Sequence, residues 1–394
     1  MREANRTRIV DALRLHGRLT QVELAGVTGL SPATVSNIVK ELTGSGLLHT
    51  SFTSRSGRRA TEVTLARRLG LVAGLHFSTR QLRIAVADVA GTVVAEHHMP
   101  LALDLRHDAE LDRASLMLTD MLDRVGASLD EVLAIGLGLP APINPATGEI
   151  GARGLLRGWE AVPVAEAFQS RTGRPVFVDS EANLGARAEA QSGAARGIGE
   201  FVYIRVGHLI SAGLVIGGRP FRGASGKAGQ IGHVTIDENG PICRCGSRGC
   251  LETLAAAPAL LELFRSDPSI HRLHDLVQRA ADGDAGCQRA IADAGRHIGI
   301  AAASLANLFD PQRIVVGGEL AEAGETLLAP LRHALERSVL IGESGVPEVV
   351  PAIHGERAEL VGALGLAIES MEFGAPVPLR ASGPAEALRS EANA

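Results

Sequence analysis

Four residues near the middle of the chain have the types and spacing of a metal site. His233 is followed by Cys243, Cys245 and Cys250, which gives H-x9-C-x-C-x4-C with glycines at 240, 246 and 249. Three thiolates and one imidazole form a complete tetrahedral set for zinc, with no position left open for water. The ion is therefore expected to be structural and to tie loop 240–250 to the segment bearing His233. The alternative is a chance cluster of reduced thiols.

A second set of polar residues, near the N-terminus, could contact nucleic acid. Apolar residues of a helix expected after Ser31 recur at i, i+3, i+4 and i+7, which predicts one buried stripe: Val35, Ile38, Val39 and Leu42. Polar residues off this stripe face outward, where an asparagine can pair with adenine and a serine or lysine can hold phosphate. Two arginines of a following turn could enter a narrow minor groove. The expected DNA contacts are Ser31, Thr34, Ser36, Asn37, Lys40, Arg58 and Arg59.

The elements around these residues predict a winged helix-turn-helix. A helix over 5–16 precedes a second one that starts at Thr20, where Glu23 completes a capping box, and stops near Gly29. Ser31 caps the third helix, and β-like runs at 47–52 and 61–65 follow as a basic hairpin. This order is typical of DNA-binding domains. The alternative is a three-helix interaction module with a solvated polar face.

Charge separates the N-terminal part from the rest. Residues 1–70 hold 11 basic against 5 acidic residues, whereas the remainder holds 28 against 39, within a net charge of -5. This asymmetry favours nucleic acid as the partner of the N-terminal part alone, unless the basic residues only form a solvated face. Charges interrupt the first dozen residues, and the apolar run 132–143 is short and rich in Gly and Pro. We therefore expect a cytoplasmic protein without a membrane partner.

The rest of the chain, here called the body, starts near Leu69. Its pattern predicts an α/β fold in which strands and helices occur in two similar halves. Runs at 71–77, 82–89 and 92–99 predict an antiparallel meander. This duplicated pattern matches the two-lobed actin and hexokinase architecture, which is ribonuclease H-like. The further elements expected are strands 132–139, 201–206, 213–216 and 313–316 and helices 109–125, 297–308 and 358–371.

Several motifs of the body resemble those of the ROK family of repressors and sugar kinases, from about Gly70 to Met371. The main one is Gly229-Gln-Ile-Gly-His233 with the cysteine loop that ends at Cys250-Leu-Glu252. The fused N-terminal domain is similar to the regulator branch, which includes xylose and N-acetylglucosamine repressors. The resemblance implies a two-lobed domain, zinc, a sugar cleft and a homodimer or tetramer. Supporting segments are 136–140, 158–159, 181–183 and 315–318.

Domain limits follow from this resemblance. A winged helix-turn-helix domain is expected over 1–68 and a ROK domain over 69–372. Within the latter, the smaller lobe would comprise 69–182 with the helix 358–371, and the larger lobe 183–357. Residues 373–394 are rich in Pro, Ala and Ser and are expected to be a disordered tail.

The family's five sugar contacts map onto this chain only in part. His233 and Glu252 are unchanged, whereas Ser180, Glu181 and Gln230 replace the family's Asn, Asp and Glu. These three changes make unmodified glucose a doubtful ligand. A cleft that holds a sugar-like effector is the main expectation, and an empty, vestigial cleft is the alternative.

The residues for phosphoryl transfer are altered as well. The family's first phosphate turn, Asp-x-Gly-Gly-Thr, is His76-Phe-Ser-Thr-Arg80 here, and the second has Leu209 and Ser211 in place of glycines. Side chains there would prevent close approach of a nucleotide, and Glu181 is one methylene longer than the family's base. We therefore expect no ATP cofactor and no catalytic residues.

Together these patterns predict a DNA-binding transcriptional regulator, with a repressor favoured, for carbohydrate-related genes. It would bind an inverted-repeat operator as a homodimer or tetramer and respond to a sugar or sugar derivative. Two alternatives stay open: an active sugar kinase with an appended DNA-binding domain, and a regulator with an empty cleft that a protein partner controls.

Overall fold

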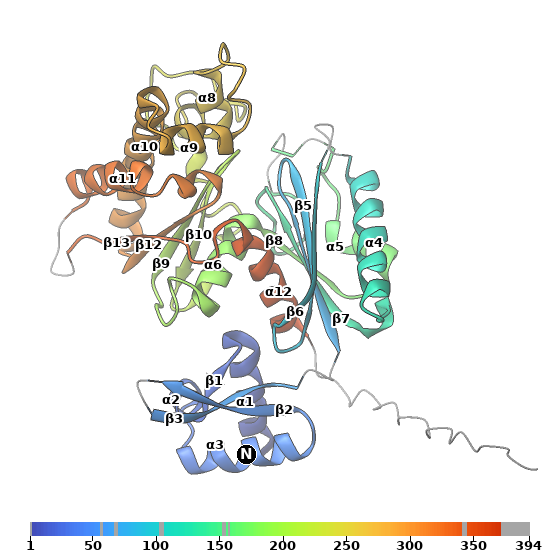
Figure 1. The fold of residues 1–394 in the computed structure, drawn as a ribbon. Coiled ribbons are helices and arrows are strands. Elements are labelled where there is room, and N and C mark those ends of the chain that lie inside the picture. The colour runs from blue at the N-terminus through green and yellow to red at the C-terminus, as the bar shows by residue number, and fades with distance from the viewer. Residues whose placement is uncertain are drawn as a thin grey trace, which may run out of the picture.

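The computed structural model of the chain describes residues 2–55, 58–66, 70–101, 106–151, 155–156, 158–340 and 345–371. The expected tail, 373–394, lies outside these ranges. Within them, one three-stranded and two five-stranded sheets are present (Figure 1). None of the described helices combines the length and apolar character that crossing a bilayer requires.

The N-terminal part folds as a winged helix-turn-helix (Figure 1). The predicted capping box is confirmed, since the Thr20 N–H donates to Glu23 Oε2 over 2.7 Å and the Glu23 N–H donates to Thr20 Oγ1 over 3.2 Å. The sequence did not predict strand β1, which pairs with β3 and completes the sheet. The elements are α1 (Arg2–His16), β1 (Leu19–Thr20), α2 (Gln21–Thr28), α3 (Pro32–Gly44), β2 (Leu48–Arg55) and β3 (Arg58–Leu65).

The first sheet of the body has the strand order β6-β5-β4-β7-β8. Strand β4 pairs antiparallel with β5, as the predicted meander requires, and parallel with β7. Helices α4 and α5 cover one face, and α12 (Ala358–Ser370) lies on the other (Figure 1). The elements are β4 (Leu71–Phe77), β5 (Gln81–Asp88), β6 (Val93–Pro100), α4 (His107–Arg124), the 3-10 turn Leu129–Glu131, β7 (Val132–Leu139), α5 (Val164–Thr172) and β8 (Val176–Ser180).

The second sheet repeats this plan with the order β11-β10-β9-β12-β13. Strand β9 pairs antiparallel with β10 and parallel with β12, as β4 does with β5 and β7. The predicted helix 297–308 is only the C-terminal half of α10. The elements are α6 (Glu181–Ser192), β9 (Phe201–Val206), β10 (Ile210–Ile216), β11 (Arg219–Phe221), α7 (Glu252–Ala255), α8 (Ala257–Glu262), α9 (Leu273–Ala281), α10 (Ala285–Phe309), β12 (Arg313–Gly317), α11 (Glu325–Ser338), β13 (Glu348–Pro351) and the 3-10 turns Ile231–His233, Glu319–Ala323 and Gly355–Arg357.

Helices α6 and α12 pack together between the two sheets (Figure 1). Their backbones come very close, because a Cβ at Gly362 would lie 1.9 Å from the Leu184 carbonyl oxygen. Strand β7 approaches α12 in the same way, since a Cβ at Gly136 would lie 1.9 Å from the Ala363 carbonyl oxygen. Glycine at these positions therefore lets α12 lie tightly against both neighbours.

The N-terminal domain shares one hydrophobic core with the body. Ile9 and Leu13 of α1 belong to the same buried cluster as Leu364 and Ile368 of α12. A polar contact supports this arrangement, because Arg196 of the body donates from Nη2 to the Arg18 carbonyl oxygen over 3.4 Å. The N-terminal domain is thus packed against the helix that lies between the two sheets.

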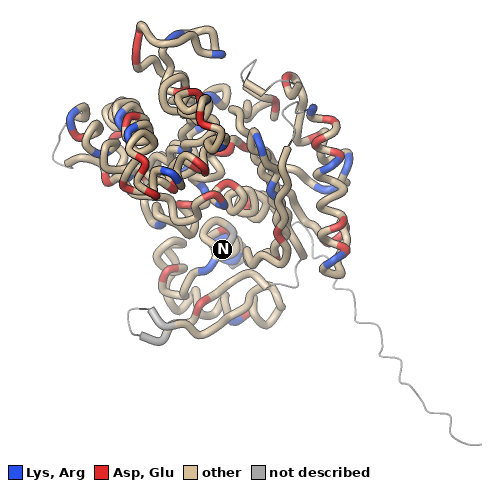
Figure 2. Tube along the Cα trace, turned by 45° about the horizontal axis from the view of Figure 1, so that its top comes forward, with Lys and Arg blue, Asp and Glu red and all other residues tan. Residues whose placement is uncertain are grey.

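Charged residues of both signs are interspersed over the helices of the body (Figure 2). On α4, the exposed Arg124 lies 2.9 Å from the exposed Asp120, one turn earlier. Such pairs on an exposed helix stabilise it only slightly. They give the body a mixed surface, unlike the basic N-terminal part.

Candidate functional site

The expected DNA-reading face is helix α3. Val35, Ile38, Val39 and Leu42 are buried, as predicted, so the opposite side of the helix faces outward. There Ser36, Asn37 and Lys40 are exposed. Ser31 caps the helix by accepting from the Thr34 N–H over 3.2 Å, and the two hydroxyls lie 2.8 Å apart with Thr34 half-buried. Ser31 and Thr34 therefore hold the start of the helix, whereas the other three are presented for contact.

The expected wing is the hairpin of β2 and β3. Its pairing runs from Leu48 with Leu65 to Arg55 with Arg58, so the strands are longer than the sequence predicted. The side chains of Arg58 and Arg59, and residues 56–57 at the tip, lie outside the described part of the structure. Their proposed contact with a minor groove therefore stays a prediction.

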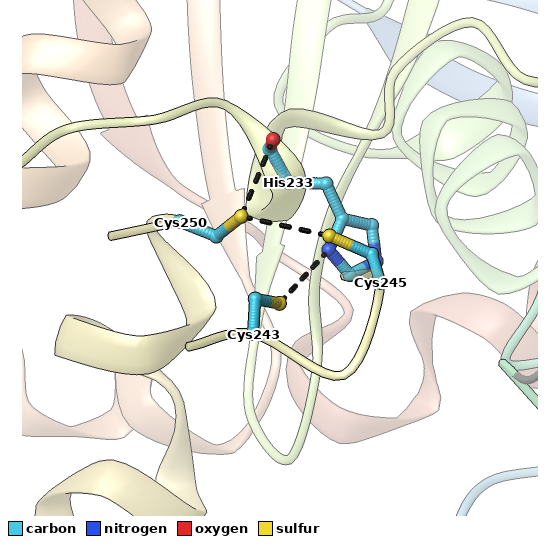
Figure 3. A group of neighbouring side chains, drawn as sticks. All are labelled: His233, Cys243, Cys245 and Cys250. Atoms are coloured by element: carbon cyan, nitrogen blue, oxygen red, sulfur yellow. Dashed lines mark hydrogen bonds between the residues drawn. The ribbon is translucent and has the colours of Figure 1, made fainter. Parts of the chain in front are cut away.

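The four expected metal ligands come together (Figure 3). Their ligand atoms all lie within 4.8 Å of one another, with Cys243 Sγ 3.6 Å from His233 Nδ1 and Cys245 Sγ 3.7 Å from Cys250 Sγ. Two Zn–S bonds of about 2.3 Å at a tetrahedral angle place their sulfur atoms about 3.8 Å apart. The residues present therefore fit zinc.

The chemistry of the cluster also calls for a cation. Burial and the two neighbouring thiols raise the pKa of Cys250 to about 12, because thiolates this close repel one another unless a cation balances them. The loop turns tightly beside Cys250, since Gly249 has a φ of +60° and a Cβ there would lie 1.5 Å from the Asp237 carbonyl oxygen. With all four donors used, such an ion would be structural.

The expected sugar contacts fall into two groups: Gln230, His233 and Glu252 flank the cysteine loop, and Ser180 and Glu181 lie at the start of α6. Glu252, at the start of α7, accepts from the Ile210 N–H over 3.2 Å and lies against Gly232, next to His233. Gln230 is half-buried one turn before His233. Ser180 is buried and caps α6, where its hydroxyl accepts from the Asn183 N–H over 3.4 Å. The hydroxyl of Ser180 is thus already engaged by the protein.

Glu181 lies in a buried network of charged side chains. Its Oε2 is 3.2 Å from His76 Nε2 and 3.3 Å from Arg205 Nε, and all three side chains are buried. Arg205 Nε also lies 3.2 Å from Glu359 Oε1 of α12, which accepts from the Tyr203 hydroxyl over 3.0 Å. The network thereby joins β4, α6, β9 and α12.

The pKa shifts within this network show that its charges are matched. Burial alone would raise the pKa of Glu181, but Arg205 and the hydrogen bond with His76 outweigh it and hold the pKa below its ordinary value. Burial would lower the pKa of Arg205, but Glu181 and Glu359 raise it above the ordinary range. Glu181 is therefore a paired carboxylate.

The two altered phosphate turns face the same region. Ser78 Oγ accepts from the Gln81 N–H over 2.9 Å, so a side chain closes the first turn. In the second turn the Gly207 N–H donates to the Leu209 carbonyl oxygen over 3.1 Å. A small cavity of about 20 Å³ lies beside the first turn, and ionisable side chains line much of it: His76, Arg83, Arg205, Glu319, Glu356 and Glu359.

Sequence reasoning missed three residues of these sites. Arg205 lies within the apolar run Phe201–Val206, and Glu359 within the apolar helix α12. An isolated charge in a buried segment is a signal that could have found both. Arg244, between two of the cysteines, is the third, since it contacts Glu252 across 3.2 Å.

Comparison with known proteins accounts for both parts of the chain. Residues 72–370 match the ROK family, and residues 2–48 match a family described as winged helix-turn-helix DNA-binding. A xylose repressor of Caldicellulosiruptor bescii is 25% identical over 391 residues, which cover 94% of this chain and 97% of that protein.

Two solved structures share the fold. A ROK family transcriptional regulator, a homolog of the Escherichia coli Mlc protein, superposes with a TM-score of 0.72 at 24% identity and covers 92% of this chain and 96% of its own. A ROK family glucokinase from Streptomyces griseus, in complex with glucose and AMPPNP, superposes with a TM-score of 0.67 at 26% identity, over 76% of this chain and 99% of its own.

Proposed function

Because the chain belongs to the ROK family and begins with a winged helix-turn-helix, we propose that it is a transcriptional repressor of carbohydrate-related genes. The observation that carries this proposal is that Glu181, at the position of the family's base, is paired with His76 and Arg205, while α3 presents an exposed polar face. The repressor names of full-length relatives support it. We place the DNA-binding domain at 1–68 and the ROK domain at 69–372, with the lobes divided as expected above.

DNA recognition would fall to α3, which enters the major groove in domains of this class. Asn37 would read a base and Ser36 and Lys40 would hold phosphates, since all three are exposed, while Ser31 and Thr34 fix the helix start. A two-fold dimer or a tetramer would then bind an inverted repeat, with one α3 in each half-site.

The response to an effector would run through α12. This helix carries Glu359 of the buried network at its first turn and shares a core with α1 further along. A ligand between the lobes that changes the angle of the two sheets would move α12 and shift α1 with it. The effector and the operator would then favour different positions of α1, so binding of either one would weaken binding of the other.

The Cys₃His cluster would hold a structural zinc ion. His233, Cys243, Cys245 and Cys250 would anchor loop 240–250, which places Glu252 at the start of α7. Such an ion would support the cleft without taking part in chemistry.

An active sugar kinase is the rival function, and the body shares its fold with a ROK glucokinase. The pairing of Glu181 with Arg205 argues against it, since a general base must be free to take a proton. Capture by a protein partner is a further way to control the same repressor.

The test is a genome-wide map of DNA bound by the protein, followed by titration of the recovered operator. We expect a shared inverted repeat near carbohydrate genes and binding at least about a thousandfold tighter than to random duplex. Equal affinity for operator and random duplex at moderate salt would contradict the proposal. Release of ADP with a panel of hexoses would instead establish the kinase.

A further inference from the structure

The four expected zinc ligands differ in their exposure to solvent. Cys243 and Cys250 are buried and His233 is half-buried, whereas Cys245 is exposed. Thiols are oxidised according to their thiolate character and their accessibility. A small oxidant in solution would therefore reach the Cys245 sulfur before the sulfur atoms of the other two cysteines.

A second thiol lies within reach of Cys245. The Cys245 sulfur is 3.7 Å from the Cys250 sulfur (Figure 3). Gly246 and Gly249 both have a positive φ and turn the chain so that Cys250 returns beside Cys245. A disulfide bond is about 2.05 Å long, so rotation of the two side chains would be enough to close it. Cys243 is a poorer partner, because a bond across the single residue 244 would close a small, strained ring.

The loop that these thiols hold also joins the two halves of the body. Arg244 donates from Nη1 to the Leu155 carbonyl oxygen over 3.1 Å, and Leu155 lies between β7 and α5. The Leu251 N–H, directly after the last cysteine of the loop, donates to the Val234 carbonyl oxygen over 3.0 Å, next to His233. Release of a metal from the cluster would therefore loosen the loop and its contact with the other half.

We propose that Cys245 and Cys250 form a peroxide-sensitive thiol pair, whose oxidation to a disulfide releases the metal from the cluster. An accessible thiol with a second thiol beside it is the arrangement of redox-sensing cysteines and their resolving partners. The oxidant is a hydroperoxide. This modification site goes beyond the proposed repressor function and does not depend on an operator.

The oxidation takes two displacement steps. The Cys245 thiolate attacks one oxygen of hydrogen peroxide, the O–O bond breaks, and a sulfenic acid and a hydroxide form. The Cys250 thiolate then attacks that sulfur, forms the S–S bond and expels a second hydroxide. Two protons from solvent convert the hydroxides to water, so the two sulfur atoms are oxidised and the peroxide is reduced by two electrons. His233 and Cys243 alone would not retain the metal, because a structural zinc site needs four ligands.

The test is treatment of the zinc-loaded, full-length protein with a few equivalents of hydrogen peroxide. We expect release of about one zinc ion per chain, measured with a metal-binding dye. Mass spectrometry of the unfolded protein should show the loss of two hydrogen atoms, and a thiol reductant with added zinc should reverse both changes. Zinc that stays bound while other residues are oxidised would overturn the proposal.

Peptide mapping of the oxidised protein assigns the bond. An arginine separates each cysteine of the loop from the next, so trypsin places Cys243, Cys245 and Cys250 in three different peptides. We expect the peptide 245–248 to be joined to the peptide that contains Cys250. A bond between Cys243 and Cys250, or between two chains, would overturn the assignment of the pair.

Two variants separate thiol chemistry from metal binding. Cys245→His replaces one zinc ligand by another that cannot form a disulfide, so it should keep its zinc and lose it at least about tenfold more slowly in peroxide. Cys287→Ala, at the buried cysteine of α10, should lose zinc as fast as the parent. Zinc loss from Cys245→His at the parental rate would overturn the role of Cys245. If this variant bound no zinc, the peptide map of the parent would still decide.

Discussion

Glu181 stands where the family has its base, and its carboxylate lies in a buried network. A kinase base must be free to accept a proton, but this carboxylate is buried between His76 and Arg205. Removal of one partner from such a network leaves an uncompensated charge, so the three side chains hold one another in place. A change at the base alone should not revive phosphoryl transfer.

Glu181→Asp, which restores the family's residue, is therefore expected to release no ADP above background with glucose and ATP. The shorter carboxylate still faces Arg205, and both phosphate turns still lack their glycines. A coupled assay checks this, with the parent protein as control. Turnover in the variant would show that the network does not block catalysis.

The cysteine cluster gives a second test at the residue scale. Cys245→Ser should lose most of the bound zinc and about 2 kcal/mol or more of stability, because three ligands no longer close the site. Metal analysis and thermal unfolding measure the two effects. Cys287→Ala, at the lone buried cysteine of α10, should keep the zinc. Full zinc retention in Cys245→Ser would argue against the ligand set.

Sequence alone could predict the metal cluster, because its four ligands lie within eighteen residues and have a diagnostic spacing. It could not predict the network, because Arg205 and Glu359 are distant in sequence and only the packing of α12 brings them together. The same holds for Ser180, whose hydroxyl is used as a helix cap.

At the scale of elements, α3 joins a buried stripe to an exposed polar face. Asn37→Ala and Lys40→Ala should each weaken operator binding about tenfold. The lysine change should also reduce the steepness of the plot of log affinity against log salt concentration by about one, since one phosphate contact is lost.

Fluorescence anisotropy at several salt concentrations measures both quantities. Lys227→Ala removes the other lysine of the chain, in an exposed loop of the body, and should leave operator affinity unchanged. If Lys40→Ala bound like Lys227→Ala, α3 would not be the DNA-reading helix.

Elements with strong local signals were predicted well. The strands 71–77, 132–139 and 201–206 are confirmed with the same bounds, and so is the capped start of α3. Helix α11 was missed, and its Pro330 explains why, since proline inside a helix removes a hydrogen bond and argues against the assignment. Tertiary packing overrides that local cost.

At the scale of the molecule, α12 connects the buried network around Glu181 to the DNA-binding domain. Glu359→Gln removes a charge that pairs with Arg205 and should loosen α12. We therefore expect hydrogen exchange in α1 to become about tenfold faster, although the change lies at the far end of α12.

The matched control is Glu96→Gln, which removes the ion pair of Glu96 with Arg357 just before the same helix. Exchange in α1 should not change there. A uniform rise over α10 and α11 in Glu359→Gln would indicate global destabilisation, and no rise in α1 would show that the network and the domain are uncoupled.

The core that α1 and α12 share predicts how the protein would respond to truncation. Ile9 and Leu13 are buried in the cluster that also holds Leu364 and Ile368 of α12. Deleting the first 68 residues would expose apolar side chains of α12 to water. A kinase-like body without an N-terminal domain would not have to cover such a surface. Such a truncated body should self-associate or require detergent, and the two halves are best regarded as a single cooperative unit.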